Sequence, residues 1–378
     1  SKGTLSGMEK NITAIPNASL TQNLPKVQFS KNSLWSATIV ILILMIIAIV
    51  LGNVLVLVTT WLDKRLHRPN KYFVACLAVA DLLVGIFSVP IRLHLLLNPT
   101  ILASIQLCRF WTWIDICCEV ASIVTLTVIS IDRYFKISHP FQYRSRMDTR
   151  KSQLVICIIW LISGVHATLG MFSYDDSVSV IALVGKGCIN DNKIYITVTA
   201  SVFFFLPLLV ILAMYALVFH VAHTQEKRNR KGKLGRRVSS RRKKAVNKEL
   251  YQELKTARML LLVVGAFTVC WAPLFVLFFI GTYRPEYLST SQYINQILGT
   301  IFVMILPSFN SLCNPVIYAC FDREYNNAFK QLFQKVFSSQ SSSRKKLSRS
   351  SSITQSSNLK TRTTMETPLN NSTPEEHL

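Results

Sequence analysis

Seven long apolar segments, separated by polar connections, identify this chain of 378 residues as a membrane protein. Each segment is long enough to cross a hydrocarbon core of about 30 Å as an α-helix. A soluble helical protein buries one or two such segments, not seven. The predicted fold is an all-α bundle of seven transmembrane helices. The segments are Leu34–Leu62, Tyr72–Leu96, Leu107–Ile137, Ser152–Phe172, Ile194–Val221, Met259–Thr282 and Ile294–Phe321.

The charged residues are concentrated in alternate connections. Half of the residues are hydrophobic, yet the formal net charge is +23. Lys and Arg gather in residues 63–71, 138–151 and 227–244, and the other connections contain few of them. Because cytoplasmic loops carry the excess of basic residues, we expect a multi-pass protein of the plasma membrane with its amino terminus outside the cell. Nucleic-acid binding is disfavoured, since the basic residues belong to loops that face the cytosol.

These patterns divide the chain into four parts. Residues 1–32 are the predicted extracellular segment, with glycosylation expected at the sequons of Asn11 and Asn17. The membrane domain spans residues 33–321, including a basic third intracellular loop at 222–252; a short amphipathic helix on the membrane surface (322–333) and a disordered Ser/Thr-rich tail (334–378) follow. Phosphorylation of the tail would present negative charge to a partner protein. The basic run either contacts anionic membrane lipids or is a solvated loop.

Two of the nine cysteines lie outside the interiors of the apolar helices. Cys108 begins the third segment and Cys188 lies in the connection between the fourth and fifth. Both fall on the predicted outer side, where oxidation is permitted. We expect a disulfide that holds this connection over the third helix. Two free thiols are the alternative.

The third apolar segment carries acids at two depths. Asp115 and Arg133 lie five helical turns apart on one face, about 27 Å along the axis. Glu119 lies one turn below Asp115, about 6 Å away, and like charges at this distance repel. Three resolutions remain: Glu119 is protonated, it pairs with Arg92 or another internal cation, or a ligand with more than one positive centre bridges both acids. Asp115 has an alternative of its own, a structural pair with Arg92.

Prolines interrupt several of these helices. Pro207, Pro273 and Pro315 each remove a backbone donor inside an apolar segment. Such a residue introduces a kink, and kinked helices can pivot.

Short motifs at the helix ends resemble those of the rhodopsin-like G-protein-coupled receptors. The matching residues are Asp132-Arg133-Tyr134, Cys270-Trp271-Ala272-Pro273, Asn314-Pro315-Val316-Ile317-Tyr318, Asn53, Asp81, Trp160, Pro207 and Tyr215. The likeness covers residues 32–333. Within the family, the stretch DICCEVASIVTLTVISIDRYFKISHPFQY is similar to the biogenic-amine branch, which includes adrenergic, serotonin, dopamine and trace-amine receptors.

The resemblance implies a ligand site in the outer half of the bundle. It implies that Asp115 pairs with the ammonium of a small cationic amine. The residues expected around the ligand are Asp115, Glu119, Thr199, Trp271, Phe275, Phe278, Met304 and Ser308. Thr199 and Ala200 replace a run of serines that would hold a catechol, so a catecholamine is disfavoured. A peptide or lipid ligand, with Asp115 structural, is the main alternative.

The resemblance also implies a switch at the inner face that activates a heterotrimeric G protein. In this switch Arg133 pairs with Glu253, and the bulky side chain of Phe141 suggests a stimulatory G protein that raises cyclic AMP. The switch residues are Asp132, Arg133, Tyr134, Phe141, Tyr215, Glu253, Asn314, Pro315 and Tyr318.

A polar set in the middle of the bundle implies an allosteric sodium ion. By resemblance its ligands are Asp81, Ser122, Asn310 and Ser311. The alternative is that Asp81 is only hydrogen-bonded to Asn53 and Asn314. We expect no enzyme activity, because the sequence shows no metal-ligand cluster, nucleophile elbow or phosphate loop.

Overall fold

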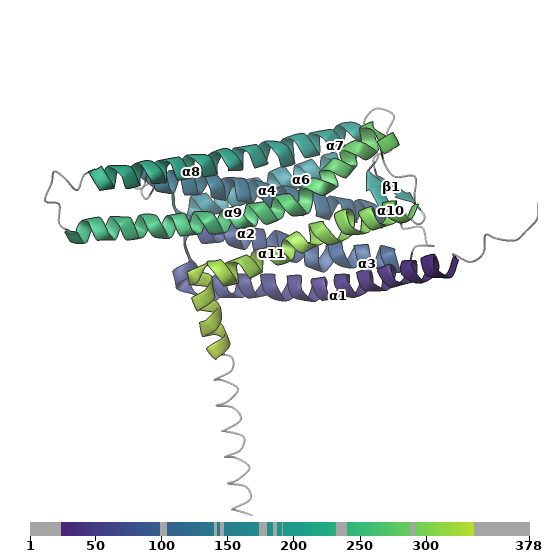
Figure 1. Ribbon diagram of the computed structural model, residues 1–378, viewed down its shortest axis with the longest axis horizontal. Helices are drawn as coiled ribbons and strands as arrows, with labels where there is room; N and C mark the ends of the chain where they lie inside the picture. The colour runs from purple at the N-terminus through teal and green to yellow at the C-terminus, as the bar shows by residue number, and fades with distance from the viewer. Residues whose placement is uncertain are drawn as a thin grey trace, which may run out of the picture.

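The structure, a computed structural model, describes residues 24–98, 104–139, 142–143, 147–173, 180–183, 187–190, 192–231, 240–287 and 292–335. Within these residues, seven helices are long and apolar enough to cross a membrane. They pack side by side into one elongated bundle (Figure 1). The predicted fold class is confirmed.

Among the described residues, the principal elements are α-helices, three π-helical turns and two strands. In chain order they are α1(Leu24–Leu62), α2(Pro69–Leu83), η2(Val84–Ser88), α3(Val89–Leu97), α4(Ile105–Ser138), α6(Thr149–Leu169), β1(Val180–Leu183), β2(Gly187–Asn190), α7(Lys193–Ala200), η3(Ser201–Phe205), α8(Leu206–Lys231), α9(Ser240–Tyr283), α10(Gln292–Leu298), η6(Gly299–Ile305) and α11(Leu306–Phe321). A further helix covers residues 323–335.

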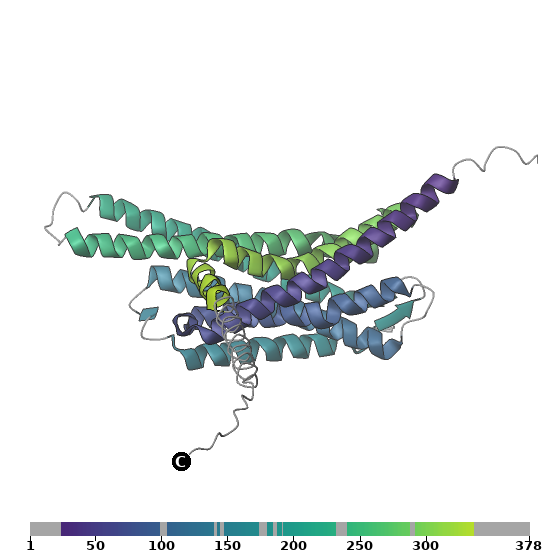
Figure 2. The same cartoon turned by 90° about the horizontal axis from the view of Figure 1, so that it is seen from below.

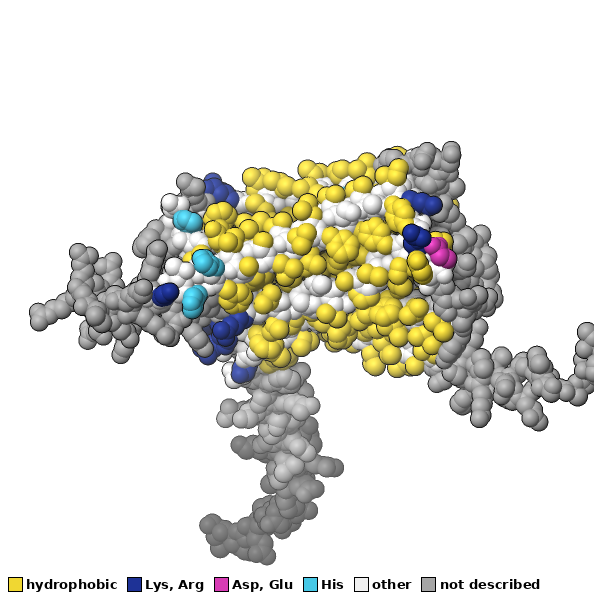
Figure 3. Space-filling model, turned by 45° about the horizontal axis from the view of Figure 1, so that its top comes forward, with side chains coloured by type: hydrophobic (Ala, Val, Ile, Leu, Met, Phe, Trp, Pro, Cys, Tyr) yellow, Lys and Arg dark blue, Asp and Glu magenta, His cyan; other side chains and the backbone are white. Residues whose placement is uncertain are grey.

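The side chains on the outside of the bundle are those of a protein surrounded by lipid. Leu44, Leu51 and Leu161 each leave 60% or more of their surface exposed. Figure 3 shows hydrophobic side chains across the middle of the molecule, Lys and Arg toward both ends, and His at one end. Inside, α4, α8, α9 and α11 share one apolar core that includes Ile123 and Phe267. This distribution of apolar surface is what a membrane-spanning bundle requires.

Each of the three π-helical turns lies just before a proline. η2, η3 and η6 precede Pro90, Pro207 and Pro307, and each turn contains the residue four positions before its proline. Proline has no N–H to donate to the carbonyl of that residue, and the proline ring clashes with this carbonyl. The helix therefore widens locally. The turns before Pro90 and Pro307 were not predicted, whereas Pro273 and Pro315 lie inside the continuous helices α9 and α11.

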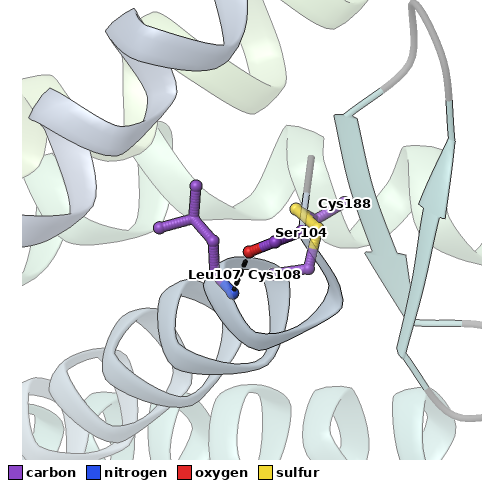
Figure 4. Close-up of a disulfide and its surroundings, with 4 residues drawn as sticks. All are labelled: Ser104, Leu107, Cys108 and Cys188. Atoms are coloured by element: carbon purple, nitrogen blue, oxygen red, sulfur yellow. Dashed lines mark hydrogen bonds between the residues drawn. A yellow bond between two sulfur atoms is a disulfide. The ribbon is translucent and has the colours of Figure 1, made fainter. Parts of the chain in front are cut away.

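A disulfide marks one end of the bundle, which we call the disulfide end. Cys108 at the start of α4 is bonded to Cys188 in β2, and their Cα atoms are 5.3 Å apart (Figure 4). Ser104 caps α4 by accepting a hydrogen bond from the backbone N–H of Leu107 (3.1 Å). β1 pairs with β2 in antiparallel register, with Ala182 opposite Cys188. The expected disulfide is present, and the small two-stranded sheet is an addition to the predicted all-helical fold.

The opposite end, which we call the basic end, is formed by the extensions of α8 and α9. Both helices project beyond the rest of the bundle (Figures 1 and 2). Residues 222–231 and 240–252, predicted as part of a loop, are helical. These stretches are rich in Lys, Arg, Glu and Gln, which are good helix formers. At the other end, α1 begins at Leu24, within the segment predicted to precede the membrane domain.

Candidate functional site

An ion pair between α3 and α4 lies on the disulfide side of the bundle core. Nη2 of Arg92 donates to Oδ2 of Asp115 at 2.7 Å, with 5% of the Arg92 side chain and 19% of the Asp115 side chain exposed. The hydroxyl of Ser88 donates to Oδ1 of Asp115 at 2.5 Å. The ring of Trp111 lies 5.5 Å from the guanidinium carbon of Arg92. Both oxygens of Asp115 are therefore occupied by partners from the second transmembrane segment.

Arg92 is held in place by a third segment as well. Its Nη1 donates to the carbonyl of Val303 at 2.6 Å and contacts that of Met304 at 3.3 Å, both in η6. Pro307 stands four residues after Val303 and cannot donate to that carbonyl. A buried carbonyl needs a partner, and the Arg92 guanidinium provides one. Arg92 thus joins α3, α4 and η6.

Glu119 lies one turn deeper on α4 and differs sharply from Asp115. Only 9% of its surface is exposed. Within the part of the chain that the structure describes, its carboxyl has no hydrogen-bond or ion-pair partner. Of the resolutions predicted for the two acids, pairing of Glu119 with Arg92 is not observed, because Arg92 pairs with Asp115. The structural pair predicted as an alternative for Asp115 is present.

The other predicted ligand residues differ in their exposure. Trp271 and Phe275 are buried in an aromatic run on α9, and the ring of Phe275 lies 4.5 Å from that of Phe204. The indole N–H of Trp271 has no hydrogen-bond partner among the described residues. Phe278, by contrast, leaves 41% of its surface exposed. Ser308 is buried and donates to the carbonyl of Met304 at 2.8 Å.

Thr199 belongs to a cluster between α6 and α7. Its hydroxyl lies 3.0 Å from Nε2 of His166 and donates to the carbonyl of Tyr195 at 2.8 Å. The His166 ring is placed between the rings of Tyr195 and Phe203, with centroid distances of 4.9 and 4.1 Å. Thr199 therefore has partners within the protein before any ligand arrives.

The predicted sodium residues are buried, and polar contacts are seen around two of them, Asp81 and Ser311. Oδ2 of Asp81 accepts from Nδ2 of Asn314 at 2.8 Å, and Nδ2 of Asn53 donates to the carbonyl of Ser311 at 3.1 Å. Ser122, Asn310 and Ser311 are buried. Among the described side chains, the amide oxygens of Asn53, Asn310 and Asn314 have no hydrogen-bond donor. Unpartnered oxygens beside a carboxylate are a fitting donor set for a hard cation.

The predicted switch residues at the basic end are described in part. Arg133 donates to Oδ2 of Asp132 at 2.7 Å, and both side chains are buried. The hydroxyl of Tyr143 donates to the other oxygen of Asp132 at 2.6 Å. Tyr134 contacts the neighbouring ring of Phe135, and Tyr215, Asn314, Pro315 and Tyr318 are buried in the interior. Glu253 lies in α9, but its side chain, the residue Phe141 and the sequons at Asn11 and Asn17 fall outside what the structure describes.

Sequence reasoning missed two side chains of these sites. Ser88 lies one helical turn before Arg92, so its position on the same face was a usable signal. Tyr143 stands within the stretch that resembles the amine receptors, but nothing in the sequence pairs it with Asp132.

Comparison with known proteins identifies the architecture. The family described as 7 transmembrane receptor (rhodopsin family) matches residues 52–318. The chain belongs to this family. A histamine H2 receptor of Cavia porcellus is 30% identical over 300 residues, which cover 78% of this chain and 78% of the relative. An alpha-1A adrenergic receptor of Oryzias latipes is 30% identical over 75% of this chain and 63% of the relative. The octopamine receptor beta-1R of Drosophila melanogaster is 27% identical over 77% of this chain and 60% of its own length.

These comparisons confirm the resemblance to the biogenic-amine branch. The chain spans less than two thirds of the length of the adrenergic and octopamine relatives. The protein is a membrane-spanning receptor and not an enzyme.

Proposed function

We propose that this receptor binds a small cationic amine near the disulfide end and activates a heterotrimeric G protein at the basic end. The charge balance around Arg92 carries the proposal. Asp115 and Glu119 are two acids, and Arg92 is the one internal base that contacts either of them among the described residues. If both acids are ionised, one negative charge remains uncompensated. Charges inside a membrane bundle need a partner, and the ammonium group of a ligand would provide it.

The names of the relatives support an amine. The similar proteins are called adrenergic, octopamine, histamine and 5-hydroxytryptamine receptors, and each name refers to a small amine. In this chain the aromatic rings of Trp271, Phe275 and Phe278 would enclose the ligand and offer cation–π contact. Thr199, Met304 and Ser308 would supply the remaining contacts.

One observation favours a second candidate function. The Arg92–Asp115 pair already satisfies the acid that amine receptors use, at 2.7 Å. A receptor for a peptide or lipid, with Asp115 structural, is compatible with this contact.

At the basic end we propose that separation of Arg133 from its partners frees α9 to move outward and admit the G protein. The Arg133–Asp132 pair observed here is the resting contact. Glu253 is the proposed second partner of Arg133, and Phe141 the proposed contact that favours a stimulatory G protein. Receptor kinases and an arrestin would act on the same side of the membrane, and the basic run of residues 227–244 would lie against anionic lipids.

We also propose that a sodium ion binds between Asp81, Ser122, Asn310 and Ser311. The unpartnered amide oxygens nearby support an ion of this kind. When bound, the ion would neutralise the Asp81 carboxylate inside the bundle. Replacing sodium chloride by choline chloride should change agonist potency in the parent but not in Asp81→Asn; equal responses in both would contradict a sodium site.

A panel of amines with a cyclic-AMP readout tests the main proposal. Cells that display the receptor would be challenged with octopamine, histamine, 5-hydroxytryptamine and noradrenaline, and cells with Arg133→Ala at equal surface density are the control. At least one amine should raise cyclic AMP in the parent only. No response to any amine would contradict the amine proposal. Inhibition of adenylyl cyclase, or calcium release without cyclic AMP, would contradict the stimulatory G protein.

A further inference from the structure

The two acids of α4, Asp115 and Glu119, differ in their partners, and the contacts of Arg92 explain the difference. Three segments converge on this guanidinium: Asp115 accepts from Nη2, the carbonyls of Val303 and Met304 accept from Nη1, and the Trp111 ring lies against it. Moving Arg92 away would remove a donor from the Val303 carbonyl and leave Asp115 without its counter-ion. Removing one member of a buried pair is strongly unfavourable. The Arg92–Asp115 pair is therefore a structural clamp.

An amine that bound Asp115 would have to compete with this clamp. Oδ2 of Asp115 receives the guanidinium and Oδ1 receives the Ser88 hydroxyl, at 2.7 and 2.5 Å. Ser88 in turn accepts a hydrogen bond from the indole of Trp111 at 3.3 Å. A ligand gains little from an acid whose charge is already neutralised.

Glu119 offers the opposite situation. Its carboxyl is nine-tenths buried, and no described residue donates a hydrogen bond to it or pairs with it. It points from the same face of α4 as Asp115, one turn deeper. An ionised carboxylate in such a place is costly unless a cation joins it.

We propose that Glu119, and not Asp115, receives the ammonium group of the ligand. This inference rests on the proposed amine function and specifies the residue that performs it. The ligand's cation then lies about 6 Å deeper in the bundle than a contact with Asp115 would place it. The rest of the ligand would then extend from the ammonium group toward the disulfide end.

The same charge balance sets the preferred number of positive centres. Two acids, the guanidinium of Arg92 and one ammonium group sum to zero charge. A ligand with two positive centres would leave one charge in excess. A monoamine is therefore preferred over a diamine, in contrast to the ligand with several positive centres that the spacing of the two acids alone allowed.

Two variants separate the roles of the acids. Glu119→Gln removes only the proposed ammonium contact, and the double variant Arg92→Gln/Asp115→Asn neutralises the clamp while keeping hydrogen-bonding side chains. The amine that is most potent on the parent in the panel above is the probe. We expect Glu119→Gln to lower its potency by about a hundredfold. The double variant should lower the potency less than tenfold. Glu119→Asp, which keeps a carboxylate at this position, should lower the potency less than Glu119→Gln does.

A matched control exists at the disulfide end. Arg284 and Glu286 form an exposed ion pair at 3.3 Å, with 67% and 56% of their side chains exposed. Arg284→Gln/Glu286→Gln makes the same chemical change outside the site and should leave potency within twofold of the parent. All potencies are compared at equal surface density, measured on intact cells.

The reverse order of effects would overturn the inference. If the double variant loses the response and Glu119→Gln keeps it, Asp115 holds the amine. If Glu119→Gln fails to reach the surface, the double variant decides: a retained response supports Glu119 and a lost response at normal surface density overturns it. A parent that responds to no amine would instead contradict the proposed function itself, before any variant is compared.

Discussion

Pro307 illustrates how one residue without an N–H directs a charge in another helix. Because Pro307 cannot donate to the Val303 carbonyl, this oxygen is available to Arg92, which reaches it at 2.6 Å. The same guanidinium then meets Asp115 on α4. One guanidinium thus joins the Val303 carbonyl of the seventh transmembrane segment to Asp115 of the third.

The cysteines of the disulfide end provide a test at this scale. The bond closes a loop with a sequence separation of 80 and joins β2 to the start of α4. Cys108→Ala and Cys188→Ala should each reduce ligand binding and surface display. Loss of the disulfide should lower the free energy of unfolding by about 2–4 kcal/mol. Because both changes remove the same bond, the double variant should be little worse than either. Additive losses, measured as surface display and thermal inactivation, would contradict this.

At the residue scale, the sequence predicted where side chains lie more readily than which side chains they contact. Helical periodicity correctly placed Asp115 and Glu119 on adjacent turns. The predicted position of Cys108 and Cys188 on the outer side, where oxidation is permitted, correctly paired these two cysteines. The sequence left open which acid Arg92 would meet. Arg92 follows the π-helical turn before Pro90, which changes the direction in which later side chains point, and it also contacts the carbonyl of Val303. Neither effect has a signature in the spacing of charged residues.

At the scale of elements, the helix of residues 323–335 is attached to the basic end by a polar contact. Nζ of Lys71 in α2 lies 2.6 Å from Oδ2 of Asp322, which precedes this helix, and both side chains are at least nine-tenths buried. Tyr325 shares a hydrogen bond of 2.8 Å with Thr60 of α1. Burial raises the pKa of the Tyr325 hydroxyl, so it stays protonated throughout the physiological range. The exposed pair of Arg68 and Glu324 adds little.

Breaking the Lys71–Asp322 pair should destabilise the receptor. Lys71→Met leaves a buried carboxylate without its cation, and the typical cost is about 3–5 kcal/mol. Lys71→Met/Asp322→Asn, which removes both charges, should recover much of this loss. Arg68→Gln breaks the exposed pair of the same charge network, in which Glu324 also lies 3.1 Å from Nζ of Lys71, and it should change stability far less. Thermal inactivation of the solubilised receptor measures all three; a double variant as unstable as Lys71→Met would show that the charges themselves are not the cause.

The elements were predictable where one physical signal dominates. Apolar length correctly located all seven membrane helices, because the hydrocarbon core imposes a minimum span. The two strands were missed, since each has only four residues, too few for a clear alternating pattern. The helical ends of α8 and α9 were also missed. In them, polar residues with high helix propensity continue a helix beyond the apolar segment that was used to define it.

On the scale of the whole molecule, the asymmetry of charge is the dominant feature. The disulfide and the two-stranded sheet lie at one end, and the projecting parts of α8 and α9 lie at the other (Figures 1 and 2). Lys and Arg account for 42 residues against 19 for Asp and Glu, and their main clusters fall in the connections of the basic end. An electrostatic preference of this kind orients a membrane protein during insertion, so we propose that the basic end faces the cytosol.

This orientation makes a prediction for the intact cell. An epitope placed before residue 24 should be stained without permeabilisation, and one placed after residue 335 only after it. Glycosidase treatment should lower the apparent mass of the parent but not of Asn11→Gln/Asn17→Gln, because glycans are added on the outer side.

Replacing the Lys and Arg of residues 227–244 by Gln tests whether the basic residues set the orientation, since it weakens one basic connection and leaves two. We expect a minor inverted population at most. Staining of the carboxyl-terminal epitope on intact cells expressing the parent would place the basic end outside, and both the ligand site and the G-protein site would then lie on the wrong sides of the membrane for the proposed function.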